Sequence, residues 1–110
     1  MTELPEAAAE KIKQLQMKEQ ELRQLQMQKQ TFQMQVMEAE SALKELKETT
    51  EAYKIIGNVM ILAKKEEIEK DLAEKKETAQ LRITSIDRLE AKTRERAEAL
   101  QKEVIATMKG

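Results

Sequence analysis

The fold of this chain is decided by the stretch Tyr53-Lys54-Ile55-Ile56-Gly57-Asn58-Val59-Met60-Ile61-Leu62. The stretch is rich in β-branched residues, which favour strands, and it holds one of only two glycines in 110 residues. A glycine at the first of two central loop positions is typical of a type II′ hairpin turn. We therefore expect a β-hairpin over residues 53–62 that turns at Gly57-Asn58. Its expected cross-strand pairs are Ile56 with Val59, Ile55 with Met60, Lys54 with Ile61 and Tyr53 with Leu62.

Both faces of the expected hairpin are apolar apart from one lysine. A two-stranded hairpin alone is only marginally stable in water, and its two edges leave backbone groups unpaired. A plain connector between helices, the alternative interpretation, needs only about 2–8 residues and no apolar strands. We therefore predict that hairpins from several subunits join into an intersubunit β-barrel, which removes the edges and buries one apolar face. The predicted oligomer-interface residues are Tyr53, Ile55, Ile56, Gly57, Val59, Met60, Ile61 and Leu62.

The segments on either side of the hairpin carry the heptad pattern of coiled-coil helices. The first helix is expected over residues 6–51 and the second over 65–108, with no glycine or proline inside either. Because they are nearly equal in length and the hairpin reverses the chain, we expect an antiparallel two-helix coiled coil. The fold class is then all-α dominated, with residues 1–110 forming a single domain. The seam residues are Leu15, Leu22, Leu25, Phe32, Val36, Ala39, Leu43 and Leu46 in the first helix, and Ile68, Leu72, Ala79, Ile83, Ile86, Ala97, Leu100 and Val104 in the second.

Reflection of the chain about Gly57-Asn58 predicts which residues of the two helices face each other. Near the hairpin Leu46 lies opposite Ile68, so both sides of that layer are large and apolar. Farther out Leu22 faces Thr93, so the middle and outer layers are thinner. We expect a firm base near the hairpin and a looser arm.

The composition excludes most catalytic chemistry. The chain has no histidine and no cysteine, which removes imidazole bases, thiol nucleophiles, disulfides and the usual zinc, haem and iron–sulfur ligands. Ser41 and Ser85 thus have no histidine to activate them, and no glycine-rich phosphate loop is present. Charged residues make up 37% of the chain and are spread along both helices, as on solvated faces. We expect no enzyme activity, no cofactor and no metal.

Charge and hydropathy also bear on partners and location. The net charge of −1 provides no attraction toward nucleic acid or an anionic membrane. No stretch approaches the roughly 18 apolar residues that span a bilayer, and the N-terminus lacks the cationic and apolar regions of a signal peptide. We therefore expect a cytoplasmic protein with no nucleic-acid and no membrane partner.

The free ends of the two helices, far from the hairpin, carry several apolar residues. Apolar side chains at an open tip can lie against the apolar surface of another protein, and methionine adapts to varied shapes. Ordinary seam packing is the alternative, above all for Leu15 and Leu100. The predicted tip residues for binding another polypeptide are Leu4, Ile12, Leu15, Leu100, Val104, Ile105 and Met108.

Between these ends and the hairpin, the first helix is rich in glutamine and methionine from Gln14 to Gln35. Glutamine favours helices, and the seam continues through the run. We interpret it as a helix with a weakly charged flank rather than as a low-complexity segment.

Three motifs match one known family. They are Gln28-Lys29-Gln30-Thr31 in the first helix, Ala52–Ile61 at the hairpin and Glu77-Thr78-Ala79-Gln80-Leu81-Arg82 in the second helix. With these motifs and one hairpin between two equal coils, nearly the whole chain resembles the archaeal β-type subunit of prefoldin. The α-type subunits of that family carry two hairpins, and only one is found here.

The resemblance implies a function and a set of partners. It implies an ATP-independent chaperone (a holdase) in which two α-type and four β-type subunits form a hetero-hexamer. Its coiled-coil tips would capture unfolded client proteins and deliver them to a group II chaperonin. The first tip, residues 6–13, is more charged than the family pattern, which moves the expected client contact toward Leu100–Met108. The alternative function is a structural coiled-coil scaffold or tether that binds one folded partner.

Overall fold

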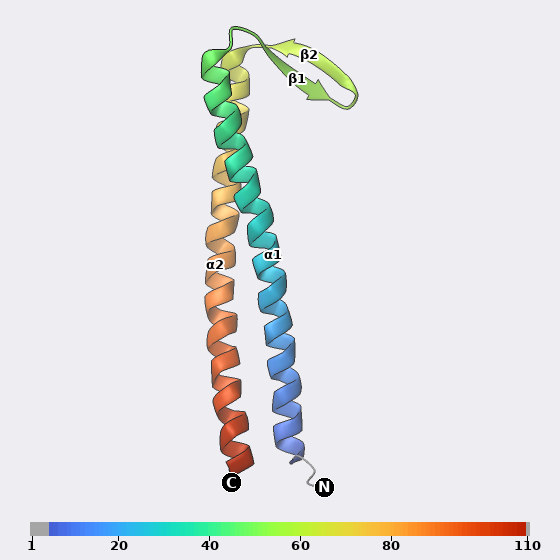
Figure 1. Ribbon diagram of the computed structural model, residues 1–110, viewed down its shortest axis with the longest axis vertical. Helices are drawn as coiled ribbons and strands as arrows, with labels where there is room; N and C mark the ends of the chain where they lie inside the picture. The colour runs from blue at the N-terminus through green and yellow to red at the C-terminus, as the bar shows by residue number, and fades with distance from the viewer. Residues whose placement is uncertain (1–4, 110) are drawn as a thin grey trace. The chain divides into compact units, whose positions relative to one another are not determined.

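The computed structural model describes residues 5–109, which form two long helices with a hairpin between them (Figure 1). In chain order the elements are α1 (Glu6–Glu48), β1 (Ala52–Ile56), β2 (Val59–Ala63) and α2 (Lys65–Lys109). This confirms the predicted helix–hairpin–helix fold, whereas the barrel built from several hairpins stays a prediction. The chain divides into two compact units, a hairpin unit of residues 30–84 and a terminal unit of residues 5–29 and 85–109, which are described separately.

The hairpin has the predicted register. Strands β1 and β2 are antiparallel, and Ile56 lies opposite Val59 at the turn. Gly57 has a φ of +59°, while Asn58 does not have a positive φ. A type I′ turn needs positive φ at both positions, so these angles favour the predicted type II′ turn. No atom lies within 4 Å of a Cβ added at Gly57, so the glycine is required for its backbone angle and not for space.

Helix α1 ends at Glu48, three residues before the expected end. The Thr49 backbone N–H and Oγ1 both donate to the Leu46 carbonyl oxygen, at 3.4 and 3.2 Å. Lys65 Nζ, at the start of α2, donates to the Lys47 carbonyl oxygen at 3.4 Å. β-Branched threonine is a weaker helix former, and these donors satisfy carbonyls that a helix end leaves open. The helix therefore ends where Thr49 and Lys65 supply donors to its last carbonyl oxygens.

The hairpin unit is held by a short apolar seam. Ala39, Leu46 and Ala79 are buried, and the other predicted seam residues of this unit are half-buried. Lys76 Nζ on α2 lies 3.3 Å from Glu40 Oε1 on α1, within one residue of the position that reflection about the turn predicts. The antiparallel register of this part of the coil is therefore confirmed.

The terminal unit has the same antiparallel register. Lys11 Nζ lies 3.7 Å from Glu103 Oε2, and Lys29 Nζ lies 2.6 Å from Asp87 Oδ1. Each pair is within one residue of its mirror position. Leu100 is only 1% exposed, and it is the only large side chain among the described residues that is completely buried. The expectation that the outer layers are the loose ones is therefore wrong at Leu100, which is buried in the seam, as is the small Ala97 one turn before it.

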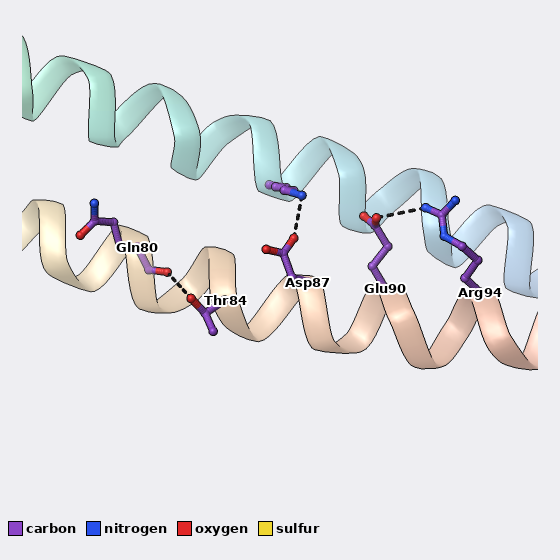
Figure 2. A network of polar contacts seen from close by, with 6 residues as sticks. Gln80, Thr84, Asp87, Glu90 and Arg94 are labelled. Atoms are coloured by element: carbon purple, nitrogen blue, oxygen red, sulfur yellow. Dashed lines mark hydrogen bonds and ion pairs between the residues drawn. The ribbon is translucent and has the colours of Figure 1, made fainter.

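A polar group interrupts the seam of the terminal unit. Glu90 is half-buried, and Figure 2 shows its carboxylate directed at Arg94, one turn further along α2, at 3.0 Å. Its other oxygen, Oε2, is buried and has no hydrogen-bond partner among the described residues. Nearby, the hydrogen bond and charge of Asp87 raise the pKa of Lys29 above its usual value. A buried carboxylate oxygen without a hydrogen-bond donor loses its hydration, and Arg94 pairs only with the other oxygen, so this layer contributes less to the coil than an apolar layer would.

Replacing Gly57 by alanine should destabilise the hairpin by about 1–2 kcal/mol, because an L-residue is strained at a positive φ. The measurement is amide hydrogen exchange of the strand residues, which should become faster. Asn58→Ala is the matched control, since Asn58 needs no positive φ. Equal exchange in the two variants would contradict this explanation of the turn.

Replacing Glu90 by leucine should raise the free energy of unfolding by about 1–2 kcal/mol, since it removes the unpaired buried oxygen and restores an apolar seam position. Thermal unfolding followed by circular dichroism measures the change. The control is Glu95→Leu, at an exposed position on the same helix. A melting temperature of E90L no higher than that of E95L would show that Glu90 does not limit the coil.

Candidate functional site

The hairpin presents the most apolar surface of its unit. Seven large apolar side chains on its two faces are 47–68% exposed. Contiguous apolar surface of this kind marks an interaction site in soluble proteins. The exposed residues are Tyr53, Ile55, Ile56, Val59, Met60, Ile61 and Leu62. All the predicted interface residues thus lie together on β1, β2 and their turn, and Gly57 is exposed at the turn itself.

The edges of the hairpin are also unpaired among the described residues, because the sheet contains only two strands. The two-residue turn makes Ile56 and Val59 a hydrogen-bonded pair, and such pairs alternate along an antiparallel ladder. The backbone groups of Ile55 and Met60 therefore point outward, one to each edge. Strands from other chains could add to both edges.

A salt-bridge clamp, formed by Lys54 with Asp71 and Glu67, links the hairpin to its own helix. Lys54 Nζ on β1 lies 3.4 Å from Asp71 Oδ2 and 3.8 Å from Glu67 Oε1, both near the start of α2. The hairpin face that carries Lys54 is thereby turned toward α2. The opposite face, with Tyr53 and Ile55, is left for another partner. From the sequence, Lys54 is only a polar exception on an apolar face. The alternation of side chains along a strand does not predict its partners, because they lie on α2.

The distal ends differ residue by residue. Ile105 and Met108 on α2 are exposed. Leu100 is buried, as the seam-packing alternative predicts. The half-buried members of the predicted tip set are Ile12, Leu15 and Val104. Leu4 lies outside the described residues, and client binding by any of these side chains stays a prediction.

A hollow on α1 was not predicted as a site. It is shallow and widely open to solvent, its surface is mostly apolar, and all its lining residues lie on α1 within the hairpin unit. Four of its residues recur at spacings of three and four, on the side of α1 opposite to the seam. That second periodicity is the sequence signal that could have revealed it. The residues lining the hollow are Gln30, Gln33, Met34, Met37, Glu38 and Ser41.

Residues 5–109 offer neither a metal-binding cluster nor a membrane-spanning helix. That part of the chain contains no group of three or more side chains able to hold a metal ion. None of its helices is both long and apolar enough to cross a membrane. The candidate binding surfaces of these residues are the exposed apolar ones: the hairpin, the hollow on α1, and Ile105 and Met108 on α2.

Comparison with known proteins identifies the family. A family model described as "Prefoldin subunit" matches residues 9–110. The prefoldin subunit beta of Archaeoglobus fulgidus is 40% identical over 106 residues, covering 93% of this chain and 91% of that protein. The prefoldin subunit beta of Methanocella arvoryzae is 37% identical over 62 residues, covering 56% of this chain and 49% of that protein. The crystal structure of the prefoldin beta subunit from Thermococcus strain KS-1 superposes with a TM-score of 0.91 at 26% identity, over 100% of this chain and 99% of the other. The chain therefore belongs to the prefoldin subunit family, within which it is similar to the β-type subunits, as its hairpin motif predicted.

Proposed function

We propose that this chain is a subunit of an ATP-independent holdase, which captures unfolded proteins and delivers them to a group II chaperonin in the cytoplasm. The observation that carries the proposal is the uncovered hairpin. Seven exposed apolar side chains on two strands with open edges are unfavourable in a solitary chain and favourable in an assembly. Family membership adds the chaperone role.

The assembly has other prefoldin subunits as its partners. In the form implied by the family, two α-type and four β-type subunits contribute hairpins to shared barrels. Barrel closure would pair the outward backbone groups at both edges of each hairpin and bury one face. The clamp from Lys54 to Asp71 and Glu67 favours one orientation of the hairpin relative to α2, with a contribution of about 0–1 kcal/mol from each of these exposed pairs.

Client capture then depends on several weak contacts made at once. Each arm offers a small exposed apolar surface, such as Ile105 and Met108, and no ATP site is needed for such contacts. When several arms hold one chain, the second and later contacts are intramolecular and the overall grip becomes much tighter. Each contact stays weak enough to be released during transfer to the chaperonin.

A structural scaffold or tether is the second candidate. The observation that favours it is the burial of Leu100, which shows a well-packed coil close to the distal end. Such a coil suits a rigid spacer that binds one folded partner. The holdase candidate uses the exposed hairpin for assembly and the exposed tip residues for client capture, whereas the scaffold candidate does not.

The double substitution Ile105→Ser and Met108→Ser should weaken client protection. The chain is co-assembled with an α-type prefoldin subunit, and aggregation of guanidine-denatured citrate synthase is followed by light scattering without nucleotide. Loss of two apolar contacts per arm should raise the concentration for half-maximal protection by about three- to tenfold. Leu89→Ser, at an exposed position in the same unit, is the control. If the double variant protects the client as well as the control does, Ile105 and Met108 are not client contacts.

The double substitution Ile55→Asp and Met60→Lys should break the assembly into smaller species. The two residues are paired across the strands, so opposite charges keep the hairpin itself intact while a buried barrel face would contain charge. Size-exclusion chromatography with light scattering gives the mass. The control is Leu81→Asp, which is as exposed on α2. The scaffold candidate predicts that the double variant keeps the mass of the unsubstituted protein.

A further inference from the structure

One side of α1 in the hairpin unit is apolar although it faces away from α2. The seam of this segment contains Phe32, Val36 and Ala39, which point toward α2. Met34 and Met37 lie on the other side and are 61% and 66% exposed. Together with Gln30, Gln33 and Ser41 they line the hollow described above. These five residues are called the methionine face.

The methionine face is free of charge in a chain that is rich in charge. No charged residue occurs from Gln30 to Met37, whereas charged residues make up 37% of the whole sequence. Glu38 is the one charged residue that lines the hollow. Leu81 on α2 is equally exposed, at 64%, but it stands next to Arg82 in sequence. A ligand that settles on the methionine face therefore displaces little tightly bound water.

The chemistry of the face argues against a permanent folded partner. Two methionines offer far less than the roughly 1,200 Å² that stable interfaces bury in total. In coiled coils, charged residues beside the seam select the partner helix. Gln33, which lies beside Met34 and Met37, carries no charge, so the methionine face lacks that means of selecting a helical partner on this side. Methionine is flexible and repacks around different shapes, which suits varied partners.

The same chemistry suits an extended, unfolded segment. An unfolded backbone carries unpaired N–H and C=O groups, and the amides of Gln30 and Gln33 can both donate and accept hydrogen bonds. Apolar side chains of the segment can rest against Met34 and Met37. A segment with many charges would have to lose its hydration without finding countercharges here.

We infer that the methionine face is a second client-contact surface, which takes extended, apolar, uncharged segments of non-native polypeptide. This inference rests on the proposed holdase function. It places client contact on the wall of the arm within the hairpin unit, in addition to the predicted residues at the distal ends.

The test uses the chain co-assembled with an α-type prefoldin subunit and guanidine-denatured citrate synthase as the client. The variant Met34→Gln with Met37→Gln keeps helix propensity and neutrality while it removes the thioethers. Half-maximal protection should need about a threefold higher concentration. Leu81→Gln, which removes an equally exposed apolar side chain from the same unit, should leave protection unchanged.

Photocrosslinking from Met37→benzoylphenylalanine identifies what touches the face. Crosslinks to citrate synthase, together with weaker protection in M34Q/M37Q, are the expected result. Crosslinks to another subunit, with a lower assembly mass in M34Q/M37Q, would show a subunit interface and overturn the inference. Unchanged protection without client crosslinks would also overturn it, and if I105S/M108S still weakens protection, the holdase function stands. If the unsubstituted assembly gives no protection, the proposed function fails and this inference fails with it.

Discussion

The tight turn at Gly57-Asn58 is the constraint on which the structure depends. Its positive φ at Gly57 reverses the chain within two residues and fixes the pairing of Ile56 with Val59. Because only residues 49–51 and Lys64 separate the helices from the strands, side chains of α1 and α2 at mirror positions about this turn meet in the hairpin unit, as the Lys76–Glu40 pair shows. The turn satisfies the inner backbone groups and leaves two open edges. The need for other chains therefore arises from the same feature that sets the register.

Much of the fold could be predicted because it follows from one periodicity and one point of reflection. The strand register and the ion pair Lys29–Asp87 lie where that reflection puts them. The end of α1 at Glu48 could not be placed, because it depends on threonine hydroxyl bonds rather than on heptad spacing. The burial of Leu100 agrees with its place in the predicted seam, whereas the expectation that the outer layers are thin did not anticipate so complete a burial. The barrel and the client contacts stay predictions, because they form between chains.

The ion pairs and the seam of the coiled coil stabilise it only moderately. Its ion pairs between helices are partly exposed, and such pairs contribute about 0–1 kcal/mol each. The seam contains alanine at several buried positions and accepts the unpaired oxygen of Glu90. Alanine buries little apolar area, so helix pairing relies on many small contributions along the length. An arm of this kind can be held together without a large core and with Phe32 as the one aromatic residue of its seam.

The types of exposed apolar residue differ between the hairpin and the arm, and the difference corresponds to two kinds of contact. The hairpin exposes mainly β-branched residues such as Ile55, Ile56 and Val59, whose side chains are stiff. Stiff side chains suit a fixed register, in which each repeats the same contact in every copy of an assembly. The methionine face instead exposes Met34 and Met37, which lose more conformational freedom when immobilised but can follow any shape. Permanent contacts favour stiff side chains and transient contacts with varied chains favour flexible ones, so the predominance of β-branched residues on the hairpin and the two methionines of the methionine face agree with the different roles proposed for them, although the hairpin also exposes Met60.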